Sequence, residues 1–163
     1  VLFLIFYFSS NSKKRQNELE GTQTLNRCLM LEKYLAQVSQ ELEIPMPKKE
    51  KEKIYRLALN EDFVITQQEL KPGVNFFCDL IPCPDEHKEA LFLYALKANI
   101  LGERTEDCYL GLDAAEEKLT ISLTVNRELT YSEYKNKLED FTNQVVFWSE
   151  ELDQYYHQKL RKS

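Results

Sequence analysis

The sequence predicts one α+β domain in which helices pack against a twisted antiparallel sheet. Two periodicities lead to this prediction. In the stretch 130–160, apolar residues recur alternately three and four positions apart, which is the spacing of one face of an α-helix. Shorter stretches between 54 and 125 alternate apolar and polar residues or are rich in β-branched and aromatic ones, which is typical of strands. With 163 residues, of which 43% are apolar, the chain can bury a single core.

The helix at 130–160 gives the strongest periodic signal. Thr130 is its predicted N-cap and Glu133 stands three residues later, which together form a capping box. About 30 residues at about 1.5 Å each would span about 45 Å, more than the width of a small domain. We therefore expect the stripe to lie across the sheet of its own subunit, with the last turns extending past it. The stripe comprises Tyr131, Tyr134, Leu138, Phe141, Val145, Trp148, Leu152 and Tyr155.

A first helix is expected from Thr24 to Glu43, because apolar residues there again follow one helical face. Pro45 and Pro47 end it, since proline lacks a backbone donor and disfavours a helical residue before it. The charged hexapeptide Lys48–Lys53 is interpreted as a solvated loop.

Three strands are expected next, joined as an antiparallel meander by turns at 60–62 and 71–73. In the second turn, Pro72 presets φ and Gly73 tolerates a positive φ. The predicted strands are Ile54–Leu59, Phe63–Leu70 and Val74–Ile81.

A second helix, Asp85–Leu101, is apolar almost all the way round its middle. A helix that is buried on one side needs only one apolar stripe. The simplest source of the additional cover is a second subunit. A hairpin of Cys108–Asp113 and Leu119–Val125 follows, and the complete predicted order is α-β-β-β-α-β-β-α.

Residues 1–23 are expected to lie outside this domain, which then spans 24–163. The run Val1–Phe8 is apolar, but a helix of that length covers about 12 Å, against about 30 Å for the hydrocarbon core of a bilayer. The basic residues follow the run, whereas a signal peptide has them before it. We interpret 1–23 as a disordered tail or as translated upstream sequence, and we expect no membrane insertion.

The charge and the cysteines exclude further classes of function. The formal net charge is −6, so a nucleic-acid partner, which requires clustered positive charge, is not expected. Of the four cysteines, Cys28, Cys78, Cys83 and Cys108, only Cys78 and Cys83 lie close together in sequence, and their spacing matches no compact zinc site. We interpret all four as free thiols and expect no metal.

No catalytic motif is found. The sequence has no phosphate-binding loop, no dinucleotide-binding glycine pattern and no pair of histidines at metal-ligand spacing. Cys83 and His87 could be arranged as nucleophile and base, but Cys83 lies between two prolines and no oxyanion site is indicated. We expect no enzymatic activity and no cofactor, with a small thiol enzyme based on Cys83 or Cys78 as an alternative.

The order of elements resembles the class I chaperones of bacterial type III secretion, the Tir-chaperone or SycE-like family. The resemblance depends on the segment Cys108–Asp113, the strand Leu119–Val125, the Trp-bearing long helix and the apolar helix before them. It covers about Leu25–Leu160. It implies a homodimer in the cytoplasm of a Gram-negative bacterium, without enzymatic activity. Such a chaperone binds the N-proximal segment of a secreted effector in extended form, keeps it soluble and export-competent, and has the secretion ATPase as a further partner.

The resemblance also places the contact surfaces. The implied dimer contact falls on the second helix and the strand after it, at Leu93, Tyr94, Leu96, Lys97, Tyr109, Leu110 and Leu112. The implied effector-binding grooves lie beside the first helix and the sheet, at Leu29, Met30, Tyr34, Tyr55, Leu57, Phe63, Ile65 and Phe77. Ordinary core packing is the alternative for each of these residues. For the chain as a whole, the alternative is a general α/β protein-interaction module unrelated to secretion.

Overall fold

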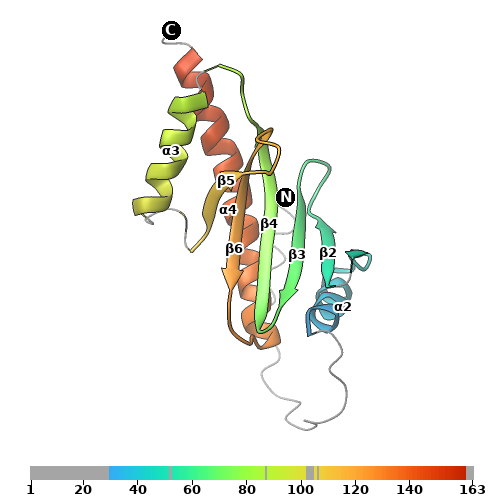
Figure 1. The fold of residues 1–163 in the computed structure, drawn as a ribbon. Coiled ribbons are helices and arrows are strands. Elements are labelled where there is room, and N and C mark those ends of the chain that lie inside the picture. The colour runs from blue at the N-terminus through green and yellow to red at the C-terminus, as the bar shows by residue number, and fades with distance from the viewer. Residues whose placement is uncertain (1–29, 52, 87, 102–104, 106, 161–163) are drawn as a thin grey trace.

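The structure is a computed structural model that describes residues 30–51, 53–86, 88–101, 105 and 107–160. Its helices and strands carry the labels of Figure 1. In chain order they are α2 (Met30–Leu42), β1 (Lys48–Lys51), β2 (Ile54–Ala58), β3 (Val64–Leu70), β4 (Gly73–Pro82), α3 (Lys88–Leu101), β5 (Tyr109–Leu112), β6 (Lys118–Val125) and α4 (Tyr131–Leu160). The predicted tail 1–23 and the predicted helix start at Thr24 lie outside the described residues.

The strands form one antiparallel sheet in the order β1-β2-β3-β4-β6-β5, so that β1 and β5 are its two edges. β6 pairs with β4 along most of its length, which places the C-terminal hairpin beside the meander. α2 and α4 lie on one face of the sheet, and the opposite face is turned toward the viewer in Figure 1, whereas α3 lies beside the edge strand β5. Mixed α+β architecture with an open antiparallel sheet is therefore confirmed.

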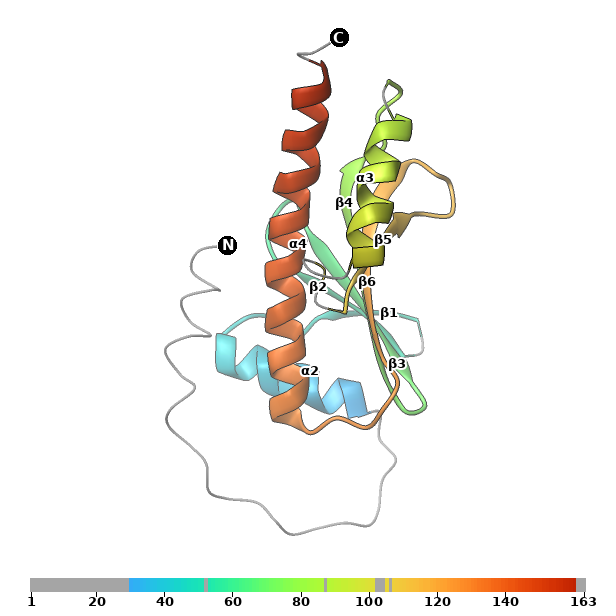
Figure 2. The ribbon, with the colours of Figure 1, turned by 90° about the vertical axis from the view of Figure 1, so that its left-hand side faces the viewer.

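The long helix α4 is the main cover of the sheet, as the spacing of its apolar residues predicts. Six of the eight stripe residues are fully buried, among them Trp148 and Phe141, whereas Tyr131 and Tyr155 near the ends are half-buried. The ring of Phe76 on β4 packs against Tyr134 and Phe141, with centroids 6.1 and 5.5 Å away. The helix thus supplies the apolar layer that closes the core (Figure 2).

The predicted start of α4 is also confirmed. The backbone N–H of Thr130 donates to Glu133 Oε2 at 2.8 Å, and the N–H of Glu133 donates to Thr130 Oγ1 at 3.3 Å. These are the two reciprocal bonds of a capping box. The Glu133 carboxylate accepts from the backbone N–H of Thr130 and also from its hydroxyl, each at 2.8 Å, and these bonds hold the pKa of the carboxyl down at about 2, together with a bond from Arg127.

Alternation along the strands separates the two faces. On β2, Tyr55 and Leu57 are buried under the helices, while Arg56 and Ala58 are exposed on the other face. Gly73, at the start of β4, has a φ of +109°, and a Cβ there would lie 1.8 Å from the carbonyl oxygen of Val125. The turn prediction for this glycine is therefore confirmed.

The prediction of a loop at Lys48–Lys53 is wrong. Lys48–Lys51 forms β1, whose backbone pairs with β2 from Lys48 opposite Arg56 to Lys51 opposite Ile54. All four side chains of β1 are exposed. A strand that buries neither face has no alternating pattern, so its composition alone could not distinguish it from a loop. The complete order in the described chain is α-β-β-β-β-α-β-β-α.

Candidate functional site

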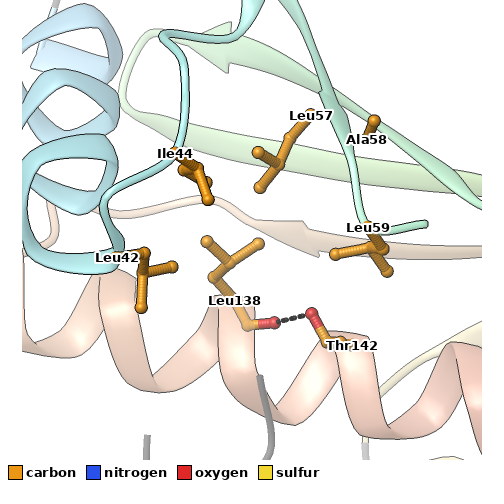
Figure 3. Close-up of a pocket in the computed structure, with 7 residues that line it drawn as sticks. All are labelled: Leu42, Ile44, Leu57, Ala58, Leu59, Leu138 and Thr142. Carbon is orange, nitrogen blue, oxygen red and sulfur yellow. Dashed lines mark hydrogen bonds between the residues drawn. The ribbon is translucent and has the colours of Figure 1, made fainter. Parts of the chain in front are cut away.

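An apolar pocket lies between α2, β2 and α4 (Figure 3). Its volume is about 80 Å³. Pockets for small-molecule ligands usually enclose ~300–1,000 Å³, so this one fits a single aliphatic side chain. It is lined by Leu42, Ile44, Leu57, Ala58, Leu59, Leu138 and Thr142.

The wall of this pocket is apolar because its one polar side chain is already bonded. Thr142 donates its hydroxyl to the carbonyl oxygen of Leu138 at 2.7 Å, within α4 (Figure 3). On the opposite wall, α2 ends at Leu42, Glu43 adopts a φ of +55°, and the N–H of Ile44 donates to Ser39 O at 3.0 Å. This reversal directs Ile44 over the pocket.

A salt bridge connects α2 to α4 beside the pocket. Lys135 of α4 donates to Glu41 of α2 at 2.6 Å. Burial acts to raise the pKa of the Glu41 carboxyl, but bonds from Lys135 and Gln37, together with the nearby hydroxyl of Tyr131, outweigh it and lower the pKa. Because the Glu41 carboxylate stays ionised, the salt bridge holds α2 and α4, two walls of the pocket, at a fixed distance from each other.

The edge strand β1 lies next to β2, so an open edge of the sheet runs near the pocket. Its side chains are held by surface contacts, since Arg56 lies 2.9 Å from Glu50 and Lys49 lies 3.6 Å from Glu32. Among the described residues, no backbone hydrogen bond from outside the sheet reaches Lys48–Lys51. An unpaired edge of this kind can accept an extended chain by strand addition.

A second surface, here named the α3–β5 patch, is an exposed apolar area. Leu91 and Ala95 form the buried side of α3. Other apolar residues of α3 and β5 stay in solvent, with exposed fractions of 52% for Leu93, 53% for Leu96, 73% for Ile100, 61% for Tyr109 and 37% for Leu112. Clustered apolar exposure on this scale is typical of a protein–protein contact.

The sheet face opposite the helices carries a mixed row. Successive pairing partners across β2, β3, β4, β6 and β5 are Arg56, Thr66, Phe77, Ser122 and Tyr109. All five are at least partly exposed. This row is too polar for a continuous apolar groove, although Phe77 and Tyr109 offer rings on it.

The structure separates the predicted dimer residues into two groups. Leu93, Leu96, Lys97, Tyr109 and Leu112 are exposed. The other two predicted residues, Tyr94 and Leu110, pack within their own subunit.

Tyr94 faces α4. Its ring stacks on Tyr155 with centroids 4.1 Å apart, and its hydroxyl donates to Glu151. Leu110 has an exposed fraction of only 6% and belongs to the core. Sequence periodicity did not mark the most exposed member of the patch, Ile100. It stands seven residues after Leu93, and that spacing on the face away from Leu91 could have indicated it.

The predicted effector-binding residues are not brought together in one site. Leu57 lines the pocket, but Ile65 and Tyr55 are fully buried, and the hydroxyl of Tyr55 donates to Glu32 at 2.8 Å. Phe77 lies on the opposite sheet face. Leu29 is outside the described residues.

The remaining predicted residues are half-buried. Tyr34 donates its hydroxyl to Leu129 O at 2.7 Å and packs on Tyr131 and Tyr134, so its side chain is part of the core packing. The N–H of Met30 donates to Glu69, and Phe63 packs against the core. The pocket residues that sequence reasoning missed come from a helix end, a strand end and the middle of α4, which no local pattern connects.

Cys78 is not an activated nucleophile. Burial raises the pKa of its thiol to about 12, and the Asp79 carboxylate acts in the same direction. Cys108 is buried and Cys83 is half-buried. His87, the proposed base beside Cys83, and Cys28 lie outside the described residues.

The described residues contain neither a metal-binding cluster nor a membrane-spanning helix. No group of three or more His, Cys, Asp or Glu side chains is placed to hold a metal ion. None of the described helices combines the length and apolar character needed to cross a bilayer.

Comparison with known proteins identifies the fold. The model of the Tir chaperone protein (CesT) family matches residues 33–149, a range that contains both the pocket and the α3–β5 patch. Comparison with curated protein sequences finds no significant match.

Several solved structures share the fold. The ExsC–ExsE complex matches with a TM-score of 0.65 and 17% identity over 78% of this chain and 97% of the other. The HopA1–SchA chaperone–effector complex matches with a TM-score of 0.56 and 16% identity over 76% of this chain and 93% of the other. YbjN, described as a transcription regulator from E. coli, matches with a TM-score of 0.51 and 15% identity over 78% of this chain and 90% of the other.

Proposed function

Because this chain belongs to the Tir chaperone protein (CesT) family, we propose that it is a type III secretion chaperone that binds the N-proximal segment of an effector in extended form. The observation that carries the proposal is the family match across 33–149. The function is binding without a chemical step. It keeps the effector segment soluble and export-competent until it is released at the secretion apparatus.

The geometry suggests how an extended client would be held. A strand added at β1 would use main-chain hydrogen bonds, which do not depend on sequence. An aliphatic side chain of the client would enter the pocket beside β2, and pockets for particular side chains supply the specificity. Ordering an extended segment costs free energy, so burial of apolar side chains is needed to offset it.

We further propose that the protein acts as a homodimer in the bacterial cytoplasm. The α3–β5 patch is the favoured contact, because the described residues of its own subunit leave its apolar side chains 37–73% exposed. In this arrangement one dimer would present two pockets. A single client segment could then pass from one subunit to the other.

The proposal is tested by client capture in the cell of origin. The tagged chain and an Ile44→Glu variant are expressed under secretion-inducing conditions, and retained proteins are identified by mass spectrometry. Ala36→Glu is the matched control, because it adds the same charge at an exposed position of α2. We expect the wild type and Ala36→Glu to retain a secreted protein that Ile44→Glu loses, because a carboxylate at the pocket is unfavourable to an apolar side chain.

The state of the captured protein separates the two functions under consideration. Limited proteolysis of the complex should protect one N-proximal segment of the client that is unfolded when free. If every captured protein is folded and bound through its folded surface, the chain is an interaction module outside secretion. The shared fold of YbjN, at a TM-score of 0.51, keeps that alternative open.

A further inference from the structure

The side chain of Asn99, in the last turns of α3, is bonded to the main chain of the edge strand β5. Its Nδ2 donates to Leu110 O at 2.8 Å, and the N–H of Leu110 donates to Asn99 Oδ1 at 2.9 Å. Both contacts are partly buried. A carboxamide that both donates to and accepts from one residue reproduces the bonds that a neighbouring strand would make there.

The direction of these bonds shows which side of β5 they occupy. β5 pairs with β6 through Tyr109 opposite Ser122 and Gly111 opposite Thr120. Because both main-chain groups of Leu110 bond to Asn99, they point away from β6, toward the outer edge of the sheet. One step earlier along this edge, the N–H of Cys108 donates to Thr105 O at 2.7 Å. The outer edge is thus occupied along the first half of the strand.

The two edges of the sheet therefore differ. At β1, no backbone hydrogen bond from outside the sheet is found in the described part of the chain. At β5, both main-chain groups of Leu110 are bonded to a side chain of the same subunit. This closure lies within the α3–β5 patch, where exposed apolar side chains favour association. An open strand edge beside such a patch is a site for uncontrolled strand pairing between copies.

We propose that Asn99 is an edge guard, a residue that closes β5 to strand addition. It restricts association at the α3–β5 patch to side-chain packing and leaves β1 as the edge that accepts an extended chain. The partner excluded at β5 is any extended polypeptide, including a strand of a second copy. The proposal does not depend on the identity of a client, nor on whether the protein is a secretion chaperone.

The test removes the carboxamide and measures the Leu110 amide directly. In Asn99→Ala, amide hydrogen exchange at Leu110, followed by NMR, should become at least about tenfold faster, because both bonds at this residue are lost. The variant should also form species larger than those of the wild type at equal concentration, with an infrared signal of intermolecular strand pairing. Asn143→Ala, an exposed change on α4, is the matched control and should leave both readouts unchanged.

A second variant keeps the test decisive if alanine disturbs the packing of α3. Asn99→Asp has the same size and still accepts from the Leu110 N–H, but it cannot donate to Leu110 O. It should keep the Leu110 amide protected and still assemble beyond the wild type, because the unpaired carbonyl reopens the edge. Fluorescence of the buried Trp148 verifies the fold of each variant. Unchanged Leu110 exchange in folded Asn99→Ala, or no larger species from either folded variant, overturns the proposal.

Discussion

Leu93→Asp is expected to separate the proposed dimer. Leu93 has an exposed fraction of 52%, and fully burying a leucine is worth about 1.5–3 kcal/mol. Covering its exposed half therefore contributes about 1 kcal/mol per copy, or about 2 kcal/mol in a symmetric pair. An uncompensated carboxylate in each contact adds a cost of about 1–3 kcal/mol. The total of about 4–8 kcal/mol weakens association by about 10³-fold or more.

Sedimentation velocity over a range of concentrations measures this change. Leu93→Ala gives the graded comparison and should weaken the dimer only about tenfold, because it removes apolar contact and adds no charge. Asn143→Asp places the same new carboxylate on an exposed part of α4 and should leave the dimer intact. A Leu93→Asp protein that remains dimeric at every concentration would refute the contact surface, and a monomeric wild type would refute the dimer itself.

Three further predictions concern stability and reactivity. Trp148→Ala should lower the free energy of unfolding by about 3–5 kcal/mol in urea titrations followed by circular dichroism, since the ring is fully buried and packs edge-on against Tyr94 of α3. Glu133 has a folded pKa of about 2 and an ordinary value of 4.5, so its contribution to stability is complete above pH 4.5 and is lost as the pH falls toward 2. Melting temperatures from pH 7 to 2 should therefore depend less on pH in Glu133→Gln than in the wild type, and an equal dependence would contradict the assignment. Cys78, whose thiol pKa is raised to about 12, should resist iodoacetamide at pH 8 until the protein unfolds, and rapid labelling of the native protein at this residue would contradict its burial.

The sequence predicted the elements whose signals are local. The stripe of α4, its capping box and the turn at Gly73 each depend on residues close together in the chain, and all are found. The alternation of residues along β2 corresponds to alternating burial, with Tyr55 and Leu57 on the buried face. Such patterns work because helices and strands repeat with fixed periods.

The edge strand β1 escaped prediction for a physical reason. Its residues Lys48–Lys51 bury nothing, and only pairing with β2 makes them a strand. The packing of Tyr94 against α4 of its own subunit was missed for a similar reason. An apolar helix does not reveal which of its faces meets its own core, and here Tyr94 stacks on Tyr155, which lies 61 positions later in the sequence.

The pocket could not be predicted because its walls are distant in sequence. Leu42, Leu57 and Leu138 meet only after α2 and α4 have both packed on the sheet. Each residue alone has the signature of ordinary core, and Leu138 is indeed almost fully buried. Family resemblance named one residue that lines the pocket, Leu57, and the other lining residues came from the structure.

The central claim is that this protein holds an effector segment in extended form. Hydrogen exchange followed by mass spectrometry, on the complex captured from the cell of origin, tests it most directly. Protection of the client should be confined to one N-proximal segment that exchanges freely when unbound, and binding should protect β1, β2 and the end of α2 in the chaperone. Protection spread through a folded client domain, with those elements of the chaperone unaffected, would contradict it.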